Sequence, residues 1–345
     1  MTHVRAIVFE EHGELDCLKE VELPDPVAKS GEVRVQIRAV ALNHLDIWVR
    51  KGWPGLRLEM PHILGSDIAG VVDQVGDDVS HIHLGQEVVL GPGTSCGDCA
   101  HCAAGQDNRC PKYAIIGEHI RGGYAELITV PAQNVFPKPP KLSFVEAACL
   151  PLVFTTAWGM LVEQAALKRH ETVLIHAGGS GVGSAAIQIA KMLGATVITT
   201  ASTATKLEKA AALGADHCIN YTEEDFAKSV WKITEKAGVD VVFEHTGGVT
   251  FNGSLRSLKL GGRLVTCGAT TKPKVEIDIR QLFAKHLSII GNTMGTLNAM
   301  IPILQHAESG QFRPVLDDVL PLSEAKQAQL RLIERAQFGK IVLTP

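Results

Sequence analysis

The 345 residues carry a net charge of −4 and are 46% hydrophobic and 20% charged, which is typical of a globular protein long enough for two domains. The sequence has no strongly basic stretch of the kind that binds nucleic acid, so we do not expect a nucleic-acid-binding protein. The most apolar run, residues 147–162, is interrupted by Pro151 and Gly159 and is shorter than the roughly 20 residues that span a bilayer. With no signal-peptide pattern at the N-terminus, we expect a cytoplasmic protein without a membrane partner.

The first half of the chain alternates short strand-like runs with Gly, Pro and Asp, which predicts a β-rich domain. The clearest runs are residues 33–39, 68–75 and 87–90. From Glu171 onward strands and helices alternate, which predicts a parallel doubly wound sheet. The predicted strands are 172–177, 196–201, 217–220, 239–245 and 263–268, with helices from about 182, 205, 225 and 250.

The last fifty residues return to a different pattern, in which a helix is followed by a strand at 314–320, a helix at 323–336 and a final strand at 339–343. We therefore expect an α/β protein of two domains. Residues 154–295 would form the doubly wound domain, and residues 1–153 together with 296–345 the β-rich domain.

A glycine-rich loop, GGSGVG at residues 178–183, joins the first strand of the doubly wound domain to a predicted helix. Backbone N–H groups and a positive helix N-terminus favour phosphate, and glycines allow its close approach. The strand-loop-helix context predicts a dinucleotide site, whereas glycines kept only for a tight turn are the alternative. The expected contacts are Gly178, Ser180, Gly181, Val182 and Gly183.

The end of the second strand predicts which dinucleotide binds. NAD-binding proteins usually place an acidic residue there to hold the ribose 2′-hydroxyl, but this chain has Ala201. Ser202, Thr203 and Lys206 offer hydroxyls and an ammonium group to a 2′-phosphate. We therefore expect NADP(H). Ser202 and Thr203 could instead cap the following helix, and the two roles are compatible.

Half of the eight cysteines lie within fifteen residues, spaced C-x2-C-x2-C-x7-C. Four thiolates complete a tetrahedral zinc shell and leave no position open for water or substrate. The pattern predicts a structural zinc site in a lobe at about residues 92–113, and disulfides or chance clustering are the weaker interpretation. The expected ligands are Cys96, Cys99, Cys102 and Cys110.

The order of these features resembles the medium-chain dehydrogenase/reductase superfamily, which includes zinc alcohol dehydrogenases and quinone oxidoreductases. Further matches are PHILGSDIAGVV, DVSHIHLGQEVV and GGYAELITVP, and the resemblance covers essentially the whole chain. It implies a Rossmann domain, a GroES-like domain with the zinc lobe, an active site in the cleft between the domains, and a homodimer or homotetramer. It also places Thr156 and Gly268 at the cofactor.

The same resemblance implies that the catalytic zinc of the alcohol dehydrogenases is missing. Their ligand positions hold Asn43, Ser66 and Leu152, with Asp67 in place of a glutamate and Leu45 in place of the proton-relaying hydroxyl. An amide, a hydroxyl and an alkyl group are poor substitutes for thiolates and imidazole. An unconventional metal site remains the alternative, built from His44, Asp46, His62 and Asp67.

Without a Lewis acid, oxidation of a simple alcohol is difficult, whereas hydride addition to a conjugated C=C needs only hydrogen-bond donors at the carbonyl oxygen. VVFEHTGGVTFNGSL and GGRLVTCGATT resemble crotonyl-CoA carboxylase/reductases. That likeness implies catalytic roles for Asn43, Glu118 and His245, although Gly117 stands where those enzymes have Phe. Ordinary buried polar structure is the alternative for all three.

We therefore expect a nicotinamide-dependent reductase of quinones, enones or enoyl thioesters, acting on a small-molecule substrate. The competing hypotheses are an alcohol dehydrogenase with an unconventional metal site and a dinucleotide-binding redox sensor or structural protein without catalysis.

Overall fold

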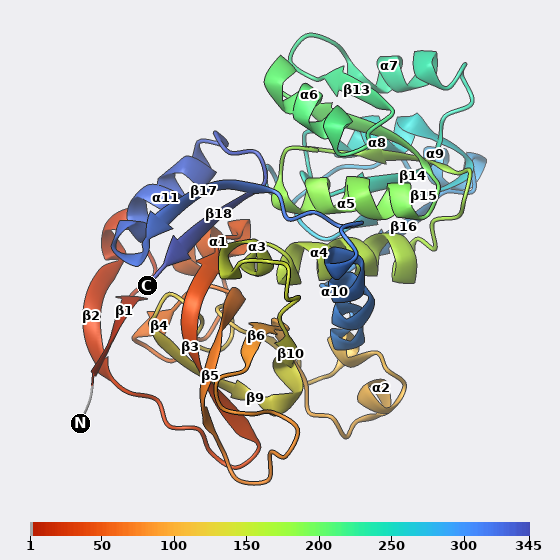
Figure 1. Cartoon of the computed structure of the whole chain (residues 1–345). Helices are drawn as coiled ribbons and strands as arrows, with labels where there is room; N and C mark the ends of the chain where they lie inside the picture. Colours follow the sequence, from red (N-terminus) through yellow and green to blue (C-terminus); the bar gives the residue numbers. More distant parts are fainter. Residues whose placement is uncertain (1–2) are drawn as a thin grey trace. The chain divides into compact units, whose positions relative to one another are not determined.

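The computed structural model describes residues 3–345 and divides them between two units (Figure 1). Unit 1 contains the described residues up to Leu152 together with Thr296–Pro345, and unit 2 is Val153–Gly295. The predicted domain boundaries, after residues 153 and 295, lie within one residue of these divisions.

Unit 2 is built on a six-stranded sheet in the order β13-β12-β11-β14-β15-β16, in which all neighbouring strands are parallel. The strands are β11 (Thr172–Ile175), β12 (Thr196–Ala201), β13 (His217–Asn220), β14 (Val239–Glu244), β15 (Leu258–Thr266) and β16 (Ser288–Gly291). The strand order reverses between β11 and β14. Dinucleotides bind at such a reversal in sheets of this kind, so the topology confirms the Rossmann prediction.

Helices connect these strands: α5 (Gly181–Met192), α6 (Ala204–Ala212), α7 (Phe226–Ile233), α8 (Phe251–Ser257) and α9 (Ile279–Ala284). Helix α5 buries Ala185, Ala186 and Ile189, three positions of one helical stripe, because a helix on a sheet covers it with a single apolar face. The central strand β14 is buried throughout, as expected where a parallel sheet is covered on both sides.

Unit 1 contains a seven-stranded, mostly antiparallel sheet in which β9 pairs with β3 and the remaining order is β10-β6-β5-β3-β18-β17. Its strands are β3 (Glu32–Ala41), β5 (Asp67–Val75), β6 (Glu87–Leu90), β9 (Leu127–Pro131), β10 (Val135–Pro137), β17 (Leu316–Pro321) and β18 (Lys340–Thr344). A smaller sheet joins β1 (His3–Phe9), β2 (Lys19–Pro24) and β4 (His62–Ile63). Strands from both ends of the chain therefore share one core, which confirms the β-rich GroES-like domain.

The helices of unit 1 are short: α1 (His44–Lys51), α2 (Ala100–Ala103), α3 (Phe144–Ala148), α10 (Met300–Glu308) and α11 (Ala325–Ile333). The predicted helix at 323–336 is present as the 3-10 turn Leu322–Glu324 followed by α11, which ends at Ile333, before the predicted end. A two-stranded ribbon of β7 (Gly93–Thr94) and β8 (Ala114–Ile115) closes the cysteine lobe.

One stretch, Phe144–Gln164, is long and apolar enough for a bilayer by length and composition. It is divided into α3, α4 (Pro151–Trp158) and a π-helical turn at Gly159–Gln164. Because 72% of its most apolar window is buried within the protein, the stretch behaves as core helix.

Candidate active site and zinc lobe

The glycine loop of unit 2 is fixed by the side chain of Ser180. Its hydroxyl donates to the Ala177 carbonyl (2.8 Å) and accepts from the Gly183 N–H (3.0 Å), which makes it the N-cap of α5. A Cβ on Gly183 would lie 2.3 Å from the Ala177 oxygen, and one on Gly178 would lie 2.4 Å from the Thr199 hydroxyl. The loop therefore needs glycine for close packing, and its backbone amides stand at the N-terminus of a twelve-residue helix, where phosphate binds favourably.

The end of β12 carries no carboxylate, and Thr203 caps α6 by accepting the Lys206 N–H (3.3 Å). The threonine O–H can still donate to a ligand, so the cap and the predicted phosphate contact coexist. The turn after β13 lies beside the end of β12. The Thr222 hydroxyl donates to the Ser202 carbonyl (3.5 Å), and the Tyr221 N–H donates to the Ala201 carbonyl (3.2 Å). Sequence reasoning did not include this turn, since its proximity to β12 depends on the strand order.

Two other predicted cofactor residues also lie in unit 2. The buried Thr156 hydroxyl donates to the Met294 sulfur (3.5 Å), and the Gly268 carbonyl accepts from Thr266 (3.4 Å) just beyond β15. Their contact with a cofactor remains a prediction.

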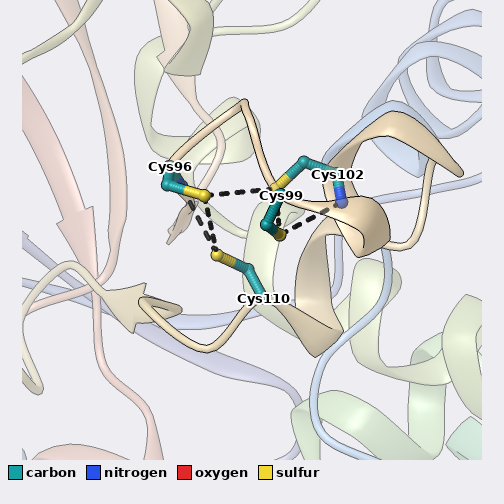
Figure 2. Close-up of side chains that lie close together, drawn as sticks. All are labelled: Cys96, Cys99, Cys102 and Cys110. Atoms are coloured by element: carbon teal, nitrogen blue, oxygen red, sulfur yellow. Dashed lines mark hydrogen bonds between the residues drawn. The ribbon is translucent and has the colours of Figure 1, made fainter.

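The four cysteines of the lobe point toward one another (Figure 2), with all four sulfur atoms within 4.8 Å. The Sγ–Sγ distances are 3.4 Å for Cys96–Cys110, 3.5 Å for Cys99–Cys102 and 3.9 Å for Cys96–Cys102. Four sulfurs at Zn–S distances of about 2.3 Å around a tetrahedral ion lie about 3.8 Å apart. The cluster therefore fits one zinc ion, whose closed shell would stabilise the lobe.

Backbone N–H groups donate hydrogen bonds to two of these sulfurs. The Cys102 N–H donates to Cys99 Sγ (3.5 Å), and the Lys112 N–H donates to Cys110 Sγ (3.3 Å). The lobe is also attached to the rest of unit 1 through Asp107, whose two carboxylate oxygens accept the Leu297 N–H at 3.1 and 3.0 Å. Both observations indicate a structural role for the lobe.

Asn43 belongs to a buried charged cluster in unit 1. Its Nδ2 donates to Asp67 Oδ2 (2.9 Å), and its Oδ1 accepts from Lys340 Nζ (2.6 Å). Lys340 Nζ also lies 2.7 Å from Asp67 Oδ2, and the Leu152 N–H donates to Asp67 Oδ1 (2.6 Å). Ser66, which precedes Asp67 in the sequence, has a buried hydroxyl with no hydrogen-bond partner among residues 3–345. The positions of the catalytic-zinc ligands in the alcohol dehydrogenases are thus held by Asn43, Ser66 and Leu152, beside the buried ion pair of Asp67 and Lys340.

Lys340 was predicted only as part of a strand, because its partners lie about 270 and 300 residues away in the sequence. A buried ammonium group beside Asn43 and Asp67 opposes the binding of a second cation there. Lys340 is the residue of this cluster that the sequence analysis did not identify.

Asp46 is fully buried and accepts from the Asn43 and Gly65 N–H groups (2.7 and 3.1 Å) and from the Tyr124 hydroxyl (3.2 Å). Burial raises its pKa to about 6. His62 Nε2 lies 3.3 Å from the Gly117 carbonyl. Within residues 3–345, the cysteine cluster is the one group of three or more His, Cys, Asp or Glu with converging ligand atoms. The structure does not bring together the alternative site of His44, Asp46, His62 and Asp67.

Glu118 follows Gly117, whose backbone packs against that of Gly65. Burial raises the pKa of the Glu118 carboxyl to about 7, and Nε2 of the neighbouring His119 lies 3.6 Å from its Oε1. Gly117 has φ of +82° and a Cβ there would lie 2.7 Å from the Gly65 backbone, so the phenylalanine of the carboxylase/reductases has no room at this position.

His245 follows β14 in unit 2, and its Nε2 lies 2.9 Å from the carbonyl oxygen of His176. Because that oxygen can only accept, Nε2 carries the proton and Nδ1 is an acceptor in the neutral ring. Burial lowers the pKa of His245, which favours the neutral form. Donation of a proton by His245 is therefore not supported. Its convergence with Asn43 and Glu118 of unit 1 remains a prediction.

Comparisons with known proteins agree with this organisation. Residues 29–140 match the alcohol dehydrogenase GroES-like domain family, and residues 181–309 match the zinc-binding dehydrogenase family. A solved structure described as an NAD-dependent alcohol dehydrogenase is 46% identical, with a TM-score of 0.96 and 99% of both chains covered. The crotonyl-CoA carboxylase/reductase of Cereibacter sphaeroides is 32% identical over 95% of this chain and 83% of its own. The quinone oxidoreductase of Homo sapiens is 28% identical, with 99% and 97% covered. The chain therefore belongs to the medium-chain dehydrogenase/reductase superfamily and is an NAD(P)-dependent oxidoreductase.

Proposed function

We propose that this protein is an NADPH-dependent reductase of quinones or α,β-unsaturated carbonyl compounds, with one structural zinc and no catalytic zinc. The observation that carries the proposal is the buried cluster of Asn43, Asp67 and Lys340, in which an ammonium group lies 2.6 and 2.7 Å from the two oxygens. A zinc ion at these residues would face that cation without thiolate or imidazole ligands.

Hydride addition to a conjugated C=C places negative charge on the carbonyl oxygen, and hydrogen-bond donors stabilise that charge without a metal. The raised pKa of Glu118 keeps a fraction of its carboxyl protonated near neutral pH, which suits a proton donor to the resulting enolate. We assign Glu118 this role in place of His245, and the crowded Gly117 argues for reduction without carboxylation.

The cofactor preference follows from the end of β12. Ala201 leaves no carboxylate to repel a 2′-phosphate, and Thr203 and Lys206 at the start of α6 provide a hydroxyl and a cation. The positive N-terminal end of α6 adds to the attraction for the phosphate. We therefore propose NADPH as the preferred cofactor. The cytoplasm is a separate proposal, which rests on the sequence pattern at the N-terminus and on the cysteine usage.

A substrate panel tests the proposed function. The purified protein is incubated with NADPH and, separately, with quinones, 2-alkenals and enoyl-CoA esters, while NAD⁺ with primary and secondary alcohols forms the opposing arm. Oxidation of NADPH by at least one conjugated acceptor is expected. Turnover confined to alcohols and NAD⁺ would refute the proposal.

Alcohol oxidation is the second candidate, and the observation in its favour is the 46% identical structure described as an NAD-dependent alcohol dehydrogenase. The opposing arm of the panel decides between the two. A non-catalytic nucleotide-binding protein would show no turnover in either arm.

We further propose that the chain forms a homodimer through β16, the last strand of the unit 2 sheet. Its outer edge has no partner strand among residues 3–345, and a strand can pair with its own copy across a two-fold axis. Ile289 on this strand is exposed. Light scattering should find a dimer, and Ile289→Lys should shift it toward monomer; an unchanged mass for the variant would place the interface elsewhere.

A further inference from the structure

The residue that starts the glycine loop has an uncommon backbone conformation. Ala177 has φ of +47°, a left-handed value that alanine adopts at a cost because its Cβ crowds the backbone, whereas glycine adopts it freely. The carbonyl of this residue accepts both the N–H (2.9 Å) and the hydroxyl (2.8 Å) of Ser180. The conformation of Ala177 therefore determines how the loop enters α5.

A chain of buried hydrogen bonds, here called the relay, connects the Ala177 N–H to Glu244 through Thr200, His176 and Ser254. Its N–H donates to the Thr200 hydroxyl (3.2 Å), and that oxygen lies 3.3 Å from Nδ1 of His176. Nε2 of His176 lies 2.8 Å from the Ser254 hydroxyl, which donates to Glu244 Oε2 (2.8 Å). The four side chains of this relay are 0–2% exposed.

The donors and acceptors of the relay fit one direction throughout. The Ser254 hydroxyl has two acceptors, the Glu244 carboxylate and the Thr250 carbonyl (3.0 Å). Donation to either one leaves the Ser254 oxygen to accept from Nε2–H of His176. Nδ1 of the same ring is then unprotonated and accepts the Thr200 O–H, which leaves the Thr200 oxygen to accept the Ala177 N–H. In this arrangement every donor and acceptor of the relay has a partner, as buried polar groups require.

Glu244 anchors the far end of the relay. Its carboxylate accepts further bonds from the Thr246 and Gly247 N–H groups (2.8 and 3.0 Å). Burial opposes its ionisation, but the hydrogen bonds that it accepts from Thr246, Gly247 and Ser254 favour the charged form and lower its pKa. The anchor is therefore a fixed negative charge at all physiological pH values.

We propose that the relay of Glu244, Ser254, His176 and Thr200 holds Ala177 in its left-handed conformation and thereby presents the glycine-loop amides to the pyrophosphate of the dinucleotide. These four are positioning residues, because they act through the loop. The inference rests on dinucleotide binding and is independent of the substrate class in the proposed function.

The first test measures the Kd for NADPH and NADH by fluorescence titration of the full chain. Thr200→Val keeps the side-chain volume but removes the hydroxyl that bonds both His176 and the Ala177 N–H. We expect a Kd increase of about five- to tenfold for both cofactors, because the bond that holds Ala177 is lost. Ser254→Ala should act in the same direction. The matched control is Ser257→Ala, on the same helix, where the buried hydroxyl bonds only its own helix backbone at Gly253 (2.9 Å); its Kd should stay within about twofold.

The second test asks whether the relay acts through Ala177. Ala177→Gly removes the steric cost of the left-handed conformation, so the combined variant with Thr200→Val should recover most of the lost affinity. A purely structural role for Thr200 predicts additive effects in this double-mutant cycle. Unchanged affinity in Thr200→Val, or additive effects in the cycle, would overturn the inference. If the wild-type protein binds nucleotide but reduces no conjugated carbonyl, the proposed function fails and this cycle still applies.

Discussion

Substitution of Lys340 by methionine tests the buried ion pair of unit 1. The ammonium group and Asp67 are 3% and 0% exposed at the side chain and lie 2.7 Å apart. Removing one partner of a buried pair costs about 3–5 kcal/mol, because the other charge is left without compensation. Asp67 keeps its bonds to Asn43 and to the Leu152 N–H, so we expect a loss near the lower end, about 3 kcal/mol.

For a unit of roughly 200 residues, each kcal/mol shifts the melting temperature by about 2–4 °C, so Lys340→Met should lower it by about 6–12 °C. Differential scanning calorimetry measures the shift. The control is the double variant Asp67→Asn with Lys340→Met, which removes both charges and should recover most of the loss. A single variant as stable as the wild type, or a double variant no better than the single, would show that the pair does not hold these segments together.

Three further predictions concern cofactor, lobe and proton donor. Lys206→Ala should raise the KM for NADPH several-fold more than that for NADH, and equal use of both cofactors by the wild type would contradict the assignment. Cys102→Ser should lower zinc content and melting temperature together, since zinc binding contributes folding free energy; lost turnover with unchanged melting would rule out a structural site. Because burial raises the pKa of Glu118 to about 7, kcat/KM should fall as pH rises through 7 and the proton is lost. Glu118→Gln should lower it about 100-fold and abolish that limb, whereas an unaltered pH profile would exclude Glu118 as the donor.

The elements of unit 2 were predictable where apolar residues repeat regularly. The runs at 196–201 and 217–220 coincide with β12 and β13, and the glycine loop marked the start of α5. Helix α9 and strand β16 were missed, because both are short and largely exposed. The cysteine cluster was predictable because its ligands are close in sequence.

The remaining site features depend on contacts between distant segments. Asn43 was a candidate catalytic group, with a buried structural amide as the alternative. Its amide is bonded to Lys340 and Asp67, which lie 297 and 24 residues away in the sequence. The tautomer of His245 likewise follows from a carbonyl 69 residues away. Local sequence patterns therefore identify candidate site residues, whereas the hydrogen-bond partners of those residues follow only from the folded topology.

The most direct test of the central claim is the zinc content of a preparation whose turnover is measured in the same sample. We predict one zinc per chain in protein that reduces a quinone or an α,β-unsaturated carbonyl compound with NADPH, with the ion lost in Cys102→Ser. Two tightly bound zinc ions per chain, with alcohol oxidation that disappears when the second is removed, would contradict the account.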